Sequence, residues 1–289
     1  MDFLQAIVLG IVQGLTEFLP ISSSGHLILV PWLFGWDEPG LSFDAALHLG
    51  TLVAVFGYFW RDIVNMVKAL PIAIRRPGYI LRTTAEELDP KDRDARLVWL
   101  LIIGSIPGGI AGLLLQSSID DFFHGEEHKD LAIALIAAML MLFALLLLAA
   151  DRAAKHRREI RSLGAMDAAV VGLAQMLALF PGVSRSGVTL TAGLFREMKR
   201  ADAARFSFLL GMPLVTIAAL KGFYDLVSEG SAGVTNAHLI AGVLASAISG
   251  FAAISVLLRF LQRSNTNVFV IYRVIAGLTV LALLATSVR

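Results

Sequence analysis

The 289-residue sequence contains no cysteine, and charged residues make up only 16% of it. The absence of cysteine excludes disulfides, thiolate metal sites and a cysteine nucleophile. Soluble domains carry about 25% charged residues, whereas here 57% of the residues are hydrophobic and the mean hydropathy is +0.75. The net charge is only +1, and no basic stripe with interleaved aromatic residues is present, so nucleic acid is not an expected partner. This composition predicts an integral membrane protein.

Six hydrophobic segments are long enough to cross a bilayer as helices, which requires about 20 residues. They are residues 43–60, 97–116, 131–150, 206–224, 238–260 and 267–288. A further segment, IVNMVKALPIAI at residues 63–74, is expected to form an amphipathic helix in the membrane interface. The chain is therefore predicted to be a multi-pass helical protein.

The segments that connect these spans divide by charge. Lys and Arg gather in residues 61–96, 151–161, 196–205 and 259–266, whereas 36–44, 120–130 and 225–237 are acidic. Because cytoplasmic loops are enriched in Lys and Arg, the first group is predicted inside and the second outside. Every span then alternates in direction, and both termini are predicted outside.

Two shorter apolar segments, 2–35 and 166–196, must then enter and leave the membrane on the same side. Each is interrupted by a polar turn: the first contains QGLTEFLPISSSGH at residues 13–26, and the second contains PGVSRSG at residues 181–187. The helix on either side of each turn is too short to cross a bilayer. Both segments are therefore predicted to be re-entrant helical hairpins.

The two hairpins are related by an internal repeat. With a shift of 162 positions, residues 6–25 align on 168–187 without a gap, and nine of the twenty pairs are identical. Each copy contains one hairpin and three spans, and the hairpins enter from opposite sides. We predict an all-α integral membrane protein with an inverted-topology repeat, six transmembrane helices and two re-entrant hairpins. It forms a single membrane domain over 1–289, with repeats at about 1–150 and 165–289 and a basic cytoplasmic linker at 151–164.

The serine-glycine turn of each hairpin begins its second helix. Free backbone N–H groups and the positive end of the helix dipole favour an anion there. In the repeat alignment, Arg185 of the second turn occupies the position that Ser23 occupies in the first turn. An arginine at this depth needs an anionic partner. That partner is either a phosphate ligand or Glu17, in a permanent ion pair that holds the hairpins together.

Both motifs, with their spacing and surroundings, closely resemble the undecaprenyl-diphosphate phosphatase family of bacteria, which is linked to bacitracin resistance. The resemblance runs over essentially the whole chain. It implies hydrolysis of undecaprenyl diphosphate to undecaprenyl phosphate and inorganic phosphate, recycling the lipid carrier for cell-wall synthesis. The implied site opens to the outer face of the bacterial cytoplasmic membrane and uses a divalent cation. The expected partners are the polyprenyl diphosphate and membrane lipids, and a homodimer is left open.

The resemblance also implies the site residues. Four are expected to be catalytic: Glu17, Ser23, His26 and Arg185. Eight are expected to bind the diphosphate: Gln13, Ser22, Ser24, Gly25, Ser184, Ser186, Gly187 and Thr189. The family carries glutamate or glutamine at the first position of the motif, and this chain has Gln13, which leaves Glu17 as the acidic group. Glu17 with Gln13 is expected to hold Mg²⁺ or Ca²⁺.

Several alternatives stay open at this stage. Ser23 is the expected nucleophile, with Glu17 or His26 as its general base, but His26 as the nucleophile is not excluded. The inverted repeat is also typical of transporters, so a transporter or flippase of the polyprenyl phosphate carrier, alone or in addition to hydrolysis, is the rival function. His48 either faces the site or is a satisfied helix histidine.

Two further features are given structural interpretations. Tyr272 and Arg273, near the inner end of the last span, are expected to anchor that span at the membrane interface. The sequence IPGGIAG at residues 106–112 is expected to allow close helix packing rather than to bind a ligand.

Overall fold

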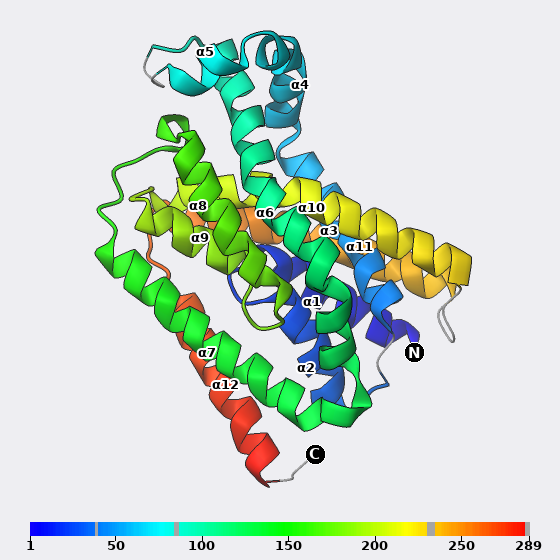
Figure 1. The fold of residues 1–289 in the computed structure, drawn as a ribbon. Coiled ribbons are helices and arrows are strands. Elements are labelled where there is room, and N and C mark those ends of the chain that lie inside the picture. The colour runs from blue at the N-terminus through cyan, green and yellow to red at the C-terminus, as the bar shows by residue number, and fades with distance from the viewer. Residues whose placement is uncertain (38–39, 84–86, 230–234, 287–289) are drawn as a thin grey trace.

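The computed structural model describes residues 1–37, 40–83, 87–229 and 235–286 (Figure 1). Over these residues the chain forms twelve α-helices and three short 3₁₀ turns, and it contains no β-strand. The first six helices are α1 (Phe3–Phe18), α2 (Ser23–Phe34), α3 (Leu41–Tyr58), α4 (Trp60–Arg75), α5 (Pro77–Arg82) and α6 (Pro90–His124). The other six are α7 (Lys129–Ala153), α8 (Ala165–Met176), α9 (Arg185–Phe195), α10 (Arg200–Glu229), α11 (Asn236–Leu261) and α12 (Asn267–Thr286).

Five of these helices, α6, α7, α10, α11 and α12, are long and apolar enough to cross a membrane. Helices α3 and α4 make a sixth candidate span if they are counted together, although they meet at an angle of 76°. The prediction of a multi-pass helical membrane protein is therefore confirmed. Helix α4 begins where the first span was expected to end, and it covers the segment predicted to be amphipathic.

The long helices extend further than hydrophobicity predicts. The span expected at 97–116 is part of the 35-residue α6, which passes through Pro107 without ending. The prediction of an acidic loop at 120–130 is wrong. Helix α6 runs to His124, and a 3₁₀ turn, Glu126–His128, leads directly into α7. Helix α10 likewise takes in the basic residues from Arg200 onward and the acidic loop as far as Glu229. Backbone hydrogen bonds continue a helix beyond the apolar segment whether or not its side chains are polar.

Small residues bring the short helices close to the long ones. Gly10 of α1 packs on Gly242 of α11, where a Cβ atom added to Gly10 would lie 2.2 Å from a backbone oxygen. Gly172 of α8 packs in the same way on Gly104 of α6, at 2.4 Å. Gly10 and Gly172 are equivalent positions of the repeat, so each hairpin is attached to a long helix by the same kind of contact. Gly108 also lies close to a neighbouring helix, as expected for the IPGGIAG sequence.

The ends of the helices gather on two sides of the molecule (Figure 1). The N-terminus, the C-terminal end of α12 and the connection between α6 and α7 lie on the lower and right-hand side of the view. The connections from α7 to α8 and from α11 to α12 lie on the opposite side. Helix α12 packs along α7, and the short helices α1, α2, α8 and α9 lie between the long ones.

Candidate active site

The turn of each hairpin has the same local structure. Ser22 is the N-cap of α2 and Ser184 is the N-cap of α9, with φ angles of 79° and 75°. Such positive values are strained for a residue with a side chain. In both turns the serine hydroxyl accepts a hydrogen bond from the N–H group three residues later, that of Gly25 or Gly187. This bond satisfies a helix N–H that has no intrahelical partner.

The two turns meet, as the sequence predicts. The backbone N–H of Gly182 donates to the Ser22 hydroxyl at 3.0 Å, and the Ser186 hydroxyl donates to the carbonyl of Leu19 at 3.0 Å. Residues 160 or more positions apart in the sequence are thus in direct contact. Helices α2 and α9 therefore begin next to each other inside the bundle.

Glu17, at the end of α1, is the centre of this junction. Its side chain is only 6% exposed. One carboxylate oxygen, Oε1, accepts from Nη2 of Arg185 at 3.0 Å. The other, Oε2, accepts from the Ser23 hydroxyl at 2.6 Å and from the Gln13 side-chain amide at 3.3 Å. The ion pair considered from the sequence is therefore present, and the same carboxylate holds the hydroxyl of Ser23.

Arg185 reaches Glu17 because α10 leaves room for it. Its Nη1 atom donates to the carbonyl of Ser207 at 3.1 Å. A Cβ atom added to Gly211 would overlap the guanidinium group. The absence of a side chain at Gly211 therefore sets the path that Arg185 takes across the junction.

The two histidines near the junction have different surroundings. Nδ1 of His26 faces the carbonyl of Ser22 at 2.7 Å, and Nε2 faces the hydroxyl of Tyr272 at 2.7 Å. Because a carbonyl only accepts, Nδ1 carries the proton and Nε2 of the neutral ring accepts from Tyr272. His48 of α3 does face the site, since its Nε2 lies 3.7 Å from Oε2 of Glu17.

The remaining residues predicted to bind the diphosphate lie in the two turns, where most of them are engaged internally. Ser22 and Ser184 cap their helices, and Ser186 lies 3.2 Å from the Ser184 hydroxyl. Thr189 donates to the carbonyl of Arg185 at 2.7 Å. Gly25 is buried against Gly182 of the other turn, and Gly187 is buried against the side chain of Arg273. Ser24 is exposed on α2.

Arg273 of α12 is a residue of this junction that the sequence interpretation missed. It is fully buried, at 0% exposure, so its assignment as an interfacial anchor is wrong. Its guanidinium donates to carbonyls of both turns and of α7: Pro20 at 3.1 Å, Gly182 at 2.8 Å, Val183 at 3.0 Å and Leu140 at 3.0 Å. An arginine within an apolar span was the available signal, because such a residue marks a functional or structural site by default.

Few groups at the junction are suited to a metal ion. Among the described residues no three His, Asp or Glu side chains are grouped closely enough to hold one. The side-chain oxygen of Gln13, however, is buried without a hydrogen-bond partner, while the nitrogen of the same amide donates to the Glu17 carboxylate. An amide oxygen beside a carboxylate is the kind of donor pair that hard cations prefer.

The fold and this junction define a class of protein: a multi-pass helical membrane protein in which two short helical hairpins hold a buried carboxylate, hydroxyl and guanidinium together. The chain matches the family described as bacitracin resistance protein BacA over residues 6–279, and it belongs to that family.

Curated proteins similar to this chain carry the name undecaprenyl-diphosphatase. The one from Thermomicrobium roseum is 49% identical over 281 residues, which cover 97% of this chain and 98% of the relative. Those from Moorella thermoacetica and Geobacter sulfurreducens are each 45% identical, over 98% of this chain and 98% and 99% of the relatives.

Proposed function

We propose that this protein hydrolyses undecaprenyl diphosphate to undecaprenyl phosphate and inorganic phosphate. The names of its relatives support this activity. The observation that carries it is the arrangement around Glu17, with the Ser23 hydroxyl 2.6 Å from one oxygen and Arg185 3.0 Å from the other. A nucleophile, its base and a cation for phosphate are thus assembled in one place.

Ser23 is the proposed nucleophile and Glu17 its base. The hydroxyl proton of Ser23 passes to Glu17 as Oγ attacks the terminal phosphorus. The bond from that phosphorus to the bridging oxygen breaks, and undecaprenyl phosphate leaves with the proton. Water then attacks the phosphoserine, which releases inorganic phosphate and restores the hydroxyl. Arg185 stabilises the charge on the phosphoryl oxygens during both transfers.

The surroundings of His26 favour Glu17 as the base. Both ring nitrogens of His26 are engaged, by the Ser22 carbonyl and by the hydroxyl of Tyr272. A phosphohistidine would require Nε2 to leave Tyr272, whereas Ser23 already lies against a carboxylate. His26 therefore serves to hold the first turn, from Ser22 to the side chain of Tyr272 on α12.

We also propose that Glu17 and Gln13 hold Mg²⁺ or Ca²⁺. The unpartnered oxygen of Gln13 supports this, and the remaining ligands would be water and substrate phosphate oxygens. When bound, the ion supplies charge neutralisation for the diphosphate. Glu17 would then hold the ion in addition to its contacts with Arg185 and Ser23.

The proposed membrane arrangement is an inverted repeat with two re-entrant hairpins. Helices α1, α2, α8 and α9 have 16, 12, 12 and 11 residues, fewer than the roughly 20 needed to cross a bilayer. The matching strained serines of the two turns, Ser22 and Ser184, also support a repeat. In this arrangement the hairpins enter from opposite sides, the termini lie outside, and the site opens to the outer face of the cytoplasmic membrane.

Release of inorganic phosphate from a water-soluble short-chain prenyl diphosphate, by protein purified in detergent, tests the activity. We expect Ser23→Ala to lower the rate on the order of a thousandfold or more. Tyr272→Phe is the matched control. It also removes one hydroxyl from the junction, but that hydroxyl contacts His26 and not Glu17. It should keep the rate within about threefold, because a single neutral hydrogen bond has a modest net value.

Two results would contradict this assignment. Near-normal turnover by Ser23→Ala, or a phosphoenzyme trapped on His26, would exclude serine as the nucleophile. If the wild-type protein releases no phosphate but moves a polyprenyl phosphate across vesicles, the rival carrier function holds instead.

A further inference from the structure

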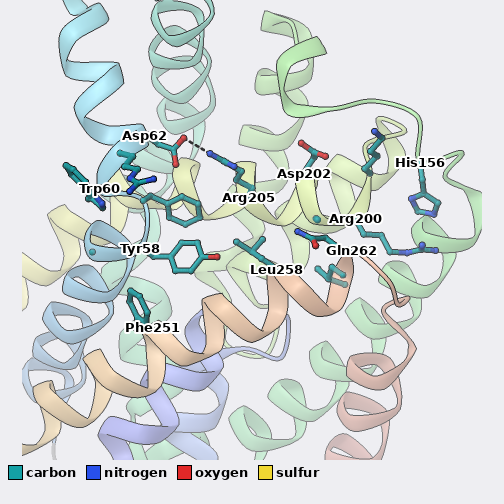
Figure 2. Close-up of a pocket in the computed structure, with 16 residues that line it drawn as sticks. Tyr58, Trp60, Asp62, His156, Arg200, Asp202, Arg205, Phe251, Leu258 and Gln262 are labelled. Atoms are coloured by element: carbon teal, nitrogen blue, oxygen red, sulfur yellow. Dashed lines mark hydrogen bonds and ion pairs between the residues drawn. The ribbon is translucent and has the colours of Figure 1, made fainter. Parts of the chain in front are cut away.

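A cavity lies away from Glu17, at the end of the molecule where the basic connections gather. Its volume is about 940 Å³. It is lined by the bend between α3 and α4, by the beginning of α10 and by the end of α11, together with His156 (Figure 2). None of the residues assigned to the candidate active site lines it. The function of this cavity is therefore separate from the chemistry at Glu17.

One wall of the cavity is basic. Four cationic side chains line it, Arg61, Lys199, Arg200 and Arg205, against two carboxylates, Asp62 and Asp202. The first turn of α10 belongs to the same wall, and its N–H groups form the positive end of the helix dipole.

Three of the four cations of this wall are paired with carboxylates. Figure 2 shows the ion pair of Arg205 with Asp62. Arg200 is paired with Asp151, and Lys199 with Glu159. The hydrogen bond to Glu159 raises the pKa of Lys199, so that side chain stays charged. Arg61 has no carboxylate partner among the residues that the structure describes, and its guanidinium lies 5.8 Å from the ring centre of Trp60.

A second wall of the cavity, adjoining the basic one, is apolar and aromatic. Tyr58 packs edge-on against Phe251 at 5.6 Å between ring centres, and Leu258 lies beside them. The hydroxyl of Tyr58 points toward Leu258 (Figure 2). Trp60 is 56% exposed at the start of the amphipathic α4. Exposed tryptophan at such a position is typical of the boundary between lipid and water.

We propose that this cavity binds the phosphate headgroup of an anionic phospholipid from the leaflet on the basic side of the protein. The basic wall accepts the phosphate, with Arg61 as its principal cation, and the aromatic wall accepts the first part of an acyl chain. A free anion would use only half of this surface, whereas an amphiphile uses both walls. Basic pockets between helices on the cytoplasmic side of membrane proteins suit such headgroups.

The test is a titration of detergent-purified protein with dioctanoyl phosphatidylglycerol, in which binding is measured as the rise in the unfolding midpoint. We expect dioctanoyl phosphatidylcholine and inorganic phosphate to bind markedly less well. Arg61→Gln should weaken phosphatidylglycerol binding about fivefold, since one basic residue near an anionic surface contributes about 1 kcal/mol. Arg75→Gln, the same change at an exposed site on α4 outside the cavity, should leave binding unchanged.

Phosphate release from the prenyl diphosphate should stay normal in both variants, which shows that they are folded. Equal binding of phosphatidylcholine, or equal weakening by Arg61→Gln and Arg75→Gln, would overturn the proposal. Arg61-dependent binding of inorganic phosphate as tight as that of the lipid would assign the cavity to free anions instead. Tighter Arg61-dependent binding of a short-chain polyprenyl monophosphate would assign it to the reaction product.

Discussion

Buried charged side chains in this protein are stabilised in two different ways. Glu17 and Arg185 are each other's counterions. Arg273 has no carboxylate partner among the described residues and instead donates to main-chain carbonyls. A buried charge without compensation is very costly, so both solutions are needed. In the proposed reaction a phosphate would replace Glu17 as the partner of Arg185, whereas the carbonyls around Arg273 belong to the fold itself.

Arg273→Lys tests this structural role. Lysine keeps the charge but cannot reach the carbonyls of both turns and of α7 at once. Carbonyls left unsatisfied cost about 1–3 kcal/mol each, so we expect a loss of about 3 kcal/mol. In a chain of this size that loss lowers the unfolding midpoint by about 6 °C or more. Phosphate release should fall with it, because Arg273 holds the turns that carry Ser22 and Ser184.

Arg259→Lys is the matched control for this measurement. Arg259 lies near the end of α11 and is exposed, so the same substitution should leave the unfolding midpoint unchanged. An unchanged midpoint in Arg273→Lys as well would mean that the carbonyl contacts do not hold the two turns.

At the scale of the elements, the site depends on how closely helices approach one another. Two short helices, α1 and α8, are attached to long ones through glycine, at Gly10 and Gly172. A third glycine, Gly211 of α10, makes room for the guanidinium of Arg185. These contacts place the ends of the hairpins and their side chains relative to each other with little freedom.

Gly211→Ala should therefore separate Arg185 from Glu17 without unfolding the protein. The added methyl group would overlap the guanidinium and force it to move. Because a displacement of about 1 Å costs on the order of a hundredfold in rate, we expect phosphate release to fall by about that factor. Gly112→Ala on α6 is the control, since its Cβ would meet no atom within 4 Å. It should be neutral or stabilise the helix by about 0.5–1 kcal/mol. Equal rates in the two variants would show that the position of Arg185 does not limit the reaction.

At the scale of the whole molecule, charge is separated along the proposed membrane normal. The basic connections lie on one side of the bundle, and the connection between α6 and α7 lies on the other with both ends of the chain (Figure 1). Such a distribution orients a protein in the membrane, because Lys and Arg stay in the cytoplasm. In the proposed membrane arrangement, this orientation decides from which side each hairpin would enter.

The absence of cysteine makes this orientation easy to test. Glu127 lies in the connection between α6 and α7, and Ser162 lies in the basic linker; both are exposed. Each is replaced by cysteine in turn, Glu127→Cys and Ser162→Cys, in the cysteine-free chain. In intact cells a membrane-impermeant maleimide should label Glu127→Cys only, and Ser162→Cys should react after permeabilisation. The cysteine-free parent is the control for background. Labelling of Ser162→Cys in intact cells would reverse the proposed topology.

Much of the fold and of the site follows from local sequence. The low charge and the long apolar segments predict the spanning helices, and the matching turns of the repeat predict that two hairpins share a common structure. The residues of these motifs, Glu17, Ser23 and Arg185, do come together. The helix ends were less predictable, because hydrophobicity marks where a chain is buried in lipid and not where its backbone hydrogen bonds stop.

The composition and the long apolar segments were enough to establish a helical membrane protein with two polar turns, because the bilayer admits few other structures. Only the packed bundle decided which distant side chains join those turns. His48, Gly211, Tyr272 and Arg273 lie outside both motifs. A charged residue within a span signals a site, but no local pattern shows which turns or side chains it contacts. Their contacts depend on how each helix is rotated against its neighbours, and that rotation results from the packing of the whole set of side chains at once.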